Sequence, residues 1–170
     1  EAGEGEEGVR YPTYPAVMST RWPEVSPVPV GWDARRLKFA VTLRSDKVEA
    51  EEAGREYLAL EHIEPSTGRR LDDDSVTSEG IATLFEAGDV LFSKLRPYLA
   101  KVYAADKRGM ATTELLVMVA EPVVLPSFLK FLLLSGKFID AVAGATYGAK
   151  MPRANWDMIG GVPVALPSLA

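Results

Sequence analysis

Four side chains that can contact an anion or a flat ring lie close together in the second half of the sequence: Lys94, Arg96, Tyr98 and Lys101. Arginine offers a planar fork of donors for a phosphate or a guanine edge, lysine offers a point charge, and tyrosine adds a hydroxyl and a stacking face. In an extended chain, alternation would place the first three on one side, and Pro97 would exclude that point from sheet pairing. Such side chains are typical of a nucleic-acid contact. The residues alone favour the alternative interpretation, an exposed sheet edge that is protected by charge.

A second group of similar side chains lies near the end of the sequence, in the segment TYGAKMPR. Lys150 and Arg153 project from this segment, while Gly148 frees the backbone and Pro152 stiffens it. A short loop of this kind, held between a packed helix and Trp156, suits contacts to phosphates and base edges. The alternative is an ordinary connection between a helix and a strand.

Motifs for catalysis or cofactor binding are missing from the sequence. The chain has one histidine, His62, and no cysteine, which excludes thiol catalysis and the usual zinc sites. We expect a structural role for His62, because no nucleophile motif accompanies it. The acidic run 72–74 lacks the spaced ligands of a calcium loop, and there is no glycine-rich loop for a phosphate or a methyl donor. We therefore expect no catalytic residue, no cofactor and no metal.

Charge is distributed unevenly along the 170 residues. The net charge of −5 argues against a nucleic-acid partner, because phosphate neutralisation supplies much of such binding. Residues 1–83 hold 10 basic and 17 acidic side chains, whereas residues 84–170 hold 9 basic and 7 acidic ones. Within 91–153 there are 9 basic and 4 acidic residues, a net of +5. The sequence thus predicts a modest basic patch on an acidic protein.

Length and composition indicate one domain that follows an N-terminal tail. Residues 1–26 begin with EAGEGEEG, and we expect this tail to be disordered or extended. The domain should comprise 27–170, with Trp32 as a large apolar anchor near its start. Apolar runs are too short to span a membrane, and a basic-then-apolar leader is missing. The lack of cysteine is compatible with the cytoplasm.

Hydrophobic periodicity predicts an α+β fold with a twisted, mixed or mostly antiparallel sheet and a late helical hairpin. A first helix is expected after Asp33 as its N-cap, with Leu37 and Val41 on one face. The late helices should cover 127–142, with a break near Gly136.

Five strands are expected, at 57–61, 90–94, 99–104, 115–120 and 162–166. The strand at 115–120 is apolar on both faces and should be central, whereas a proline places 162–166 at an edge. The charged stretch 46–55 is expected to be a loop or a short exposed helix, and 64–70 a turn.

Six stretches, in order and with matching spacing, resemble the specificity subunits of type I restriction–modification systems. They are PVPVGWDARRL, the near match YLALEHIEPSTGRRL with one extra arginine, FEAGDVLFSKLRPYLAKV, ATTELLVM, LPSFLKFLLLSGKFID and TYGAKMPRANWDMIGGVPVALPSL. Together they extend over residues 27–169, and the third, at 85–102, is the most recognisable.

The resemblance implies a non-catalytic target-recognition domain that reads one half of a bipartite DNA site. The partners it implies are double-stranded DNA, methyltransferase subunits, a translocating restriction subunit and a second target-recognition domain, with no membrane contact. The DNA-contacting residues it implies are Lys94, Arg96, Tyr98, Lys101, Tyr147, Lys150 and Arg153. In a loop where related domains would vary, it adds Ser66, Thr67, Arg69 and Arg70.

Two alternatives belong to other classes of function. The chain could be a recognition domain from a fused methyltransferase–nuclease, in which case a catalytic domain with a cofactor loop would precede it. It could also be a protein-interaction module without a DNA role, which suits the acidic net charge. A salt-dependent DNA-binding assay separates this last alternative from the others.

Overall fold

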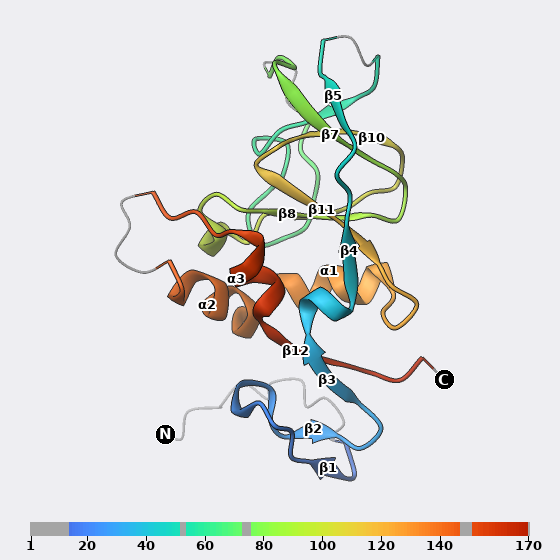
Figure 1. Cartoon of the computed structure of the whole chain (residues 1–170), viewed down its shortest axis with the longest axis vertical. Coiled ribbons are helices and arrows are strands. Elements are labelled where there is room, and N and C mark those ends of the chain that lie inside the picture. The colour runs from blue at the N-terminus through green and yellow to red at the C-terminus, as the bar shows by residue number, and fades with distance from the viewer. Residues whose placement is uncertain (1–13, 52–53, 73–75, 147–150, 170) are drawn as a thin grey trace, which may run out of the picture.

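The computed structural model describes residues 14–51, 54–72, 76–146 and 151–169. Figure 1 shows an elongated body in which small sheets follow one another along the long axis. Three helices lie beside the middle of this body, namely α1 (Pro126–Leu134), α2 (Gly136–Gly144) and α3 (Trp156–Gly161). In the described part of the chain, every helix is too short or too polar to cross a lipid bilayer.

The central sheet is antiparallel throughout. Its strands, in spatial order, are β4 (Val41–Leu43), β11 (Leu115–Ala120), β8 (Val90–Ser93) and β9 (Val102–Ala104). The prediction that 115–120 forms a central strand is therefore confirmed. Helix α1 packs on this sheet, and its Leu129 and Leu133 are fully buried in one core with Phe92 of β8. Burial of such side chains is worth about 1.5–3 kcal/mol each.

A second sheet of four strands contains one parallel pair. Its spatial order is β5 (Lys47–Glu49), β7 (Ile81–Phe85), β10 (Gly109–Thr112) and β6 (Tyr57–Leu58). Strands β6 and β10 run parallel, whereas the other two pairings are antiparallel. The predicted mixed or mostly antiparallel sheet and the α+β class are confirmed, although the strands form several sheets.

The late helical hairpin is present, and its break has a clear cause. Ser135 ends α1 and precedes α2, with an extended backbone at φ −66° and ψ 140°. Its side-chain oxygen accepts a hydrogen bond from the backbone N–H of Phe138 at 3.4 Å, which caps α2. The predicted break near Gly136 is therefore confirmed, and a capping serine marks it.

The predicted first helix is wrong. Residues after Trp32 instead form β3 (Asp33–Arg36), which pairs with β12 (Pro163–Leu166), and one turn of 3₁₀ helix, η2 (Leu37–Phe39). Pairing with a strand about 130 residues away overrides the local apolar spacing, because each backbone N–H and C=O must find a partner. The edge position predicted for 162–166 is confirmed, since β12 has β3 as its one partner.

Two other predicted elements differ in part from the structure. The stretch 46–55 contains β5 instead of being only a loop or helix, because Lys47–Glu49 pairs with β7. The strand expected at 99–104 begins at Val102, after a 3₁₀ helix, η3 (Pro97–Leu99).

The described part of the predicted tail has local structure. It contains β1 (Val17–Met18), which pairs with β2 (Val28–Pro29), and the short 3₁₀ helix η1 (Pro23–Val25) between them. Trp32 packs edge-on against Tyr14, with 5.7 Å between ring centroids, and against Phe128 of α1, at 6.0 Å. Trp32 thus fixes the N-terminal segment to the body, as predicted.

Candidate nucleic-acid interface

The two basic segments that the sequence singled out lie side by side. Leu95 and Arg153 form an isolated antiparallel bridge. The N–H of Arg96 donates to the carbonyl of Pro152 at 2.8 Å, and the N–H of Ala154 donates to the carbonyl of Lys94 at 2.9 Å. Segments about 58 residues apart in the chain are therefore held in register by their backbones, and Lys94, Arg96 and Arg153 belong to one surface.

The first basic segment is not extended as predicted. Arg96 has a left-handed backbone, with φ 47° and ψ 60°, and Pro97 begins the 3₁₀ helix η3. Strand-like alternation of Lys94, Arg96 and Tyr98 is therefore wrong, because the chain turns between them. Arg96 is nevertheless exposed, and Tyr98 is 50% exposed. The segment presents both side chains on a compact turn instead of a straight edge.

The turn at 64–70 is hydrogen-bonded to the residues that follow the first basic segment. The N–H of Ser66 donates to the carbonyls of Leu99 and Ala100, at 3.1 and 3.2 Å. Among the described residues, Ser66, Arg96 and Ala100 are the non-glycine residues with positive φ, at 61°, 47° and 47°. Such conformations cost free energy and concentrate at functional sites. Their gathering at one junction marks it as a candidate site.

The two arginines of that turn face different surroundings. Arg69 is 72% exposed and lies 3.5 Å from the carboxylate of Glu64. Arg70 is 22% exposed and forms an ion pair with Glu56. Arg69 is free to reach a ligand beside Ser66 and Thr67, which are also exposed. The position of Arg70 favours a structural role.

Lys101 has a defined partner within the domain. Its Nζ donates to the carbonyl of Leu60 at 2.6 Å, and the side chain is half-buried. This contact ties β9 to the loop after β6. Tyr147 and Lys150 lie outside the described residues.

Sequence reasoning missed an acidic residue at the centre of the interface. Glu114 lies in the turn between β10 and β11, and its carboxylate forms an ion pair with Arg153. Its carbonyl also accepts a hydrogen bond from the N–H of Lys94 at 2.9 Å. No local spacing links Glu114 to either basic segment, because only the fold brings the three together.

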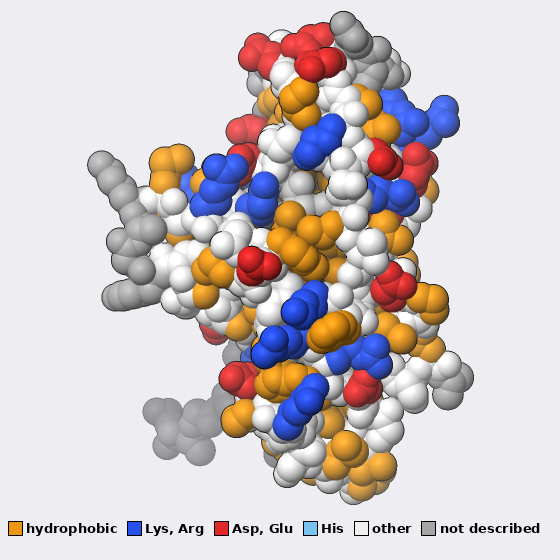
Figure 2. Space-filling model, in the orientation of Figure 1, with side chains coloured by type: hydrophobic (Ala, Val, Ile, Leu, Met, Phe, Trp, Pro, Cys, Tyr) orange, Lys and Arg blue, Asp and Glu red, His pale blue; other side chains and the backbone are white. Residues whose placement is uncertain are grey.

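The electrostatics at the junction combine burial with charges of both signs. Burial lowers the pKa of Lys94, and the charges of Arg153 and Lys47 lower it further, against the opposing attraction of Glu114. Within the described part of the chain, Arg96 forms no ion pair and Arg153 shares Glu114. Figure 2 shows Lys and Arg side chains gathered beside the segment that leads into α3. An anionic ligand would relieve this repulsion.

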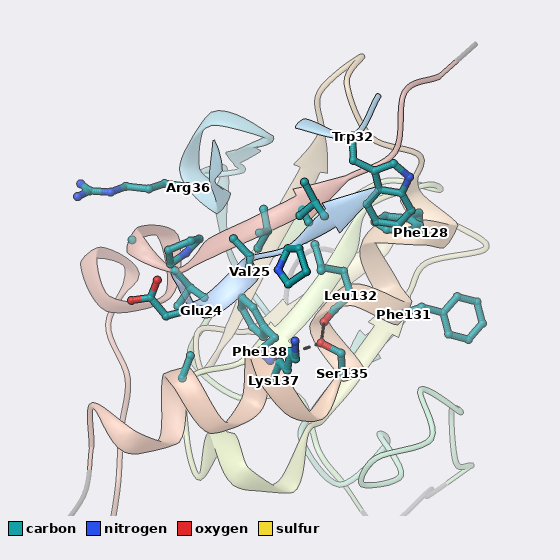
Figure 3. Close-up of a pocket in the computed structure, with 18 of the residues that line it drawn as sticks. Glu24, Val25, Trp32, Arg36, Phe128, Phe131, Leu132, Ser135, Lys137 and Phe138 are labelled. Carbon is teal, nitrogen blue, oxygen red and sulfur yellow. Dashed lines mark hydrogen bonds between the residues drawn. The ribbon is translucent and has the colours of Figure 1, made fainter. Parts of the chain in front are cut away.

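A groove of about 790 Å³ lies elsewhere, between the N-terminal segment, the helices α1 and α2, and β12. Figure 3 shows Trp32, Phe128, Leu132 and Phe138 around it, while Arg36 points away. The side chains that line this groove are mostly apolar. The predicted interface therefore remains the better candidate.

His62 makes a contact that fits its expected structural role, and the acidic residues are distributed over the described parts of the chain. The ring Nδ1 of buried His62 accepts the N–H of Ala59 at 2.9 Å, which is a structural contact. Across residues 14–51, 54–72, 76–146 and 151–169, no three His, Asp or Glu side chains group as metal ligands. The run 72–74 falls partly outside those ranges.

Comparison with known proteins supports one family resemblance. The chain is 26% identical to the Type I restriction enzyme EcoDI specificity subunit of Escherichia coli over 150 residues, which are 86% of this chain and 33% of that protein. The HsdS subunit from Thermoanaerobacter tengcongensis superposes with a TM-score of 0.65 and 20% identity, over 84% of this chain and 39% of that one. No protein-family model matches the chain.

A further solved structure comes from work on complex assembly and conformational transition of the type I R-M system. It superposes with a TM-score of 0.62 and 21% identity, over 82% of this chain and 38% of that one. The present chain thus spans about a third of the length of the curated relative. The structural likeness shows that the fold is that of HsdS subunits. The resemblance to specificity subunits that the six stretches predicted is confirmed.

Proposed function

We propose that this domain recognises a specific sequence in double-stranded DNA and reads one half of a bipartite site for a type I restriction–modification complex. The observation that carries the proposal is the backbone pairing of 94–96 with 152–154, which unites two basic segments on an exposed surface. The similarity to a specificity subunit supports the same function.

The chemistry of the paired segments suits both kinds of DNA contact. Phosphate contacts fix the register of a duplex, and base-edge contacts carry the sequence information. Arg96 and Arg153 are exposed guanidinium groups on a hydrogen-bonded backbone, which limits the entropy lost on binding. Lys94 adds charge, and exposed Tyr98 adds a hydroxyl and a ring. Arg69, Ser66 and Thr67 extend the same junction.

Several finer roles belong to the proposal. The domain would be non-catalytic, and methyltransferase subunits, a translocating restriction subunit and a second target-recognition domain would act with it. Tyr147 and Lys150 remain proposed site residues, whereas Lys101 and Arg70, which contact partners within the domain, are proposed to lie at the boundary of the site and to serve mainly the fold. Binding to cellular DNA would place the domain in the cytoplasm. Turnover of S-adenosylmethionine by the purified chain would contradict the non-catalytic role.

Titration of the purified chain with labelled double-stranded DNA tests the proposal. A duplex with a randomised centre is titrated by fluorescence anisotropy at about 50 and 200 mM salt, and the bound fraction is sequenced. We expect salt-dependent binding and enrichment of one short motif. Binding should be weak, because a second tethered domain adds about 10² to 10⁴ in affinity. Binding without motif enrichment would contradict sequence recognition, and a nanomolar Kd at physiological salt would contradict half-site reading.

A further inference from the structure

An acidic residue on a surface proposed to bind DNA needs a physical explanation. Glu114 is 26% exposed, and its carboxylate forms an ion pair with Nη2 of Arg153, which is 56% exposed. A carboxylate at this position repels phosphates and weakens any binding that depends on charge alone. Its presence therefore suggests a role in specificity instead of general affinity.

The backbone of Glu114 is held in place by the fold. Glu114 belongs to the short turn between β10 and β11, and its carbonyl accepts the N–H of Lys94 at 2.9 Å. The Lys94 carbonyl in turn accepts the N–H of Ala154, next to Arg153. Backbone hydrogen bonds thus hold the acid, the lysine and the arginine in one frame. The guanidinium of Arg153 therefore contacts an acid whose backbone is held in place.

The ion pair leaves Arg153 with unused donors. Oxygen Oε1 of Glu114 contacts a single nitrogen, Nη2, whereas a guanidinium has five N–H donors in a planar fork. Whichever N–H of Nη2 is used, one complete two-donor edge remains, either Nε with Nη2 or Nη1 with Nη2. Such an edge matches O6 and N7 of guanine in the major groove.

We propose that Glu114 is a positioning residue, which orients Arg153 so that its remaining two-donor edge reads one guanine of the target. This inference rests on the proposed DNA recognition. Glu114 does not contact the base. It limits the guanidinium to few orientations and so lowers the entropy lost when a guanine binds. It also lowers affinity for random sequence, because its charge is unfavourable near every phosphate.

Motif enrichment with matched variants tests the inference. Wild type, Glu114→Gln, Arg153→Ala and the double variant are each incubated with the randomised duplex, and the bound DNA is sequenced. The control is Glu86→Gln, because Glu86 also pairs with an arginine, Arg55, through one oxygen and one nitrogen at 3.2 Å. Glu86 precedes β8 and Glu114 contacts Lys94 just after it, so the two pairs lie at opposite ends of that strand.

We expect Glu114→Gln and Arg153→Ala to lose preference at the same guanine position, by about ten-fold or more for the arginine variant. Affinity of Glu114→Gln for unselected duplex should rise. The double variant should lose no more preference than Arg153→Ala alone, since the acid acts through the arginine. Glu86→Gln should enrich the wild-type motif.

Three results would overturn the inference. If wild type enriches no motif, the proposed function fails and the inference fails with it. If wild type enriches a motif that Glu114→Gln leaves unchanged, only the positioning role fails. If Glu114→Gln weakens all positions equally, the acid is structural. Thermal melts show whether each variant is folded, and the isosteric glutamine keeps an acceptor in the turn if alanine at position 114 is not tolerated.

Discussion

Strand β8 separates two polar regions that use the same residue types in opposite ways. Asp89 immediately precedes the strand, and Lys94 immediately follows it. At the first end, an arginine and a carboxylate neutralise each other within the domain. At the second end, cations outnumber the acid and are exposed. The comparison distinguishes charge that holds the fold together from charge that is available to a ligand.

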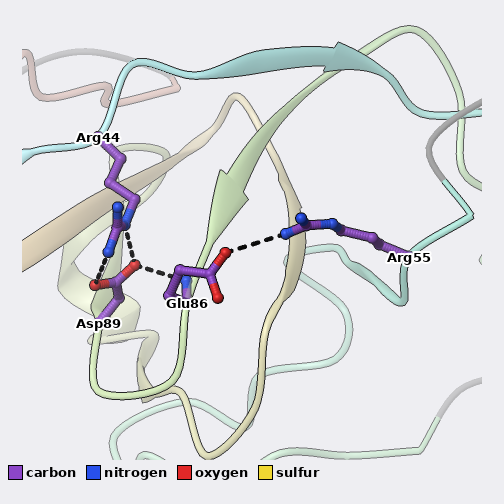
Figure 4. Close-up of polar contacts among 4 residues, drawn as sticks. All are labelled: Arg44, Arg55, Glu86 and Asp89. Atoms are coloured by element: carbon purple, nitrogen blue, oxygen red, sulfur yellow. Dashed lines mark hydrogen bonds and ion pairs between the residues drawn. The ribbon is translucent and has the colours of Figure 1, made fainter.

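The first end is closed by hydrogen bonds. Asp89 is 4% exposed and accepts from Nε and Nη2 of Arg44, at 2.5 and 3.2 Å. It also accepts the backbone N–H of Glu86 at 2.8 Å. Figure 4 shows the Asp89 carboxylate between these donors, while the Glu86 carboxylate turns away toward Arg55. The hydrogen bond that Arg44 donates to the Asp89 carboxylate raises the pKa of Arg44.

The second end is open. Arg96 and Arg153 are exposed, and burial together with neighbouring cations lowers the pKa of Lys94. Backbone hydrogen bonds hold the two basic segments in register, beside the ion pair between Arg153 and Glu114. The backbone geometry therefore rests on contacts that an arginine-to-alanine change leaves in place, and we expect such a change to keep the fold.

The largest effect is expected from Asp89→Ala. Removal of this carboxylate leaves Arg44 and the Glu86 N–H without their acceptor, which should lower the free energy of unfolding by about 3 kcal/mol. For a domain of this size, that corresponds to a Tm lower by roughly 6–12 °C. Chemical and thermal unfolding measure it. Glu86→Ala is the control and should cost under about 1 kcal/mol, because it removes an exposed pair. Equal losses of stability in the two variants would show that Asp89 contributes no more to the fold than an exposed carboxylate does.

The next effect concerns binding and not stability. Arg96→Ala and Arg153→Ala should each weaken binding to the enriched DNA by about 1–3 kcal/mol if they read bases, with Tm close to wild type. Anisotropy titrations and melts measure both quantities. A loss that is equal on enriched and random DNA would assign them to phosphates. If both variants unfold, these arginines stabilise the fold, and the region after β8 is not a ligand-binding surface.

The sequence predicted the parts of the fold that local patterns determine. The apolar central strand at 115–120 and the helical pair with a break near Gly136 both follow from short-range spacing. Strand β3 could not be predicted in this way. Leu37 and Val41 fit one face of a helix, and the pairing with β12 is long-range. Strand β10 was missed because it is short and rich in small residues, and β7 was missed because its apolar residues do not alternate with polar ones.

The candidate site was likewise predicted only in part, because residue type is visible in the sequence and long-range pairing is not. Residue type alone could select Lys94, Arg96 and Arg153, because guanidinium and ammonium groups are typical ligands of phosphates and base edges. Their meeting depends on the bridge between Leu95 and Arg153, which no local pattern encodes. Glu114 could not be selected, since a single acid in a turn is unremarkable until its partner is known.

Lys101→Met should have a smaller effect on stability and on DNA affinity, and it tests where the exposed basic region ends. The change removes the hydrogen bond from Nζ to the Leu60 carbonyl at 2.6 Å and keeps the aliphatic stem. We expect stability to fall by about 1 kcal/mol, because the bond is charge-assisted but half-exposed. Affinity for DNA should change less than for Arg153→Ala. If Lys101→Met weakens DNA binding as much as Arg153→Ala does, Lys101 contacts DNA and the boundary of the open region must be extended.

The smallest effect is expected from Arg35→Ala, which is the matched partner of Arg153→Ala. Arg35 is 31% exposed and forms an ion pair with Asp33, as Arg153 does with Glu114. It lies on β3, outside the paired segments 94–96 and 152–154. An exposed pair of this kind contributes under about 1 kcal/mol to stability, so Tm should barely change.

Salt dependence gives the sharper contrast between these two arginines. If Arg153 lies close enough to DNA to displace a counterion, Arg153→Ala should reduce the slope of log K against log salt by about 0.9. Arg35→Ala should leave that slope unchanged, because its charge is balanced by Asp33 away from the interface. Both variants remove one positive charge, so net charge cannot explain a difference between them. Equal slopes would mean that binding follows overall charge, and the open end of β8 would have no special part in DNA recognition.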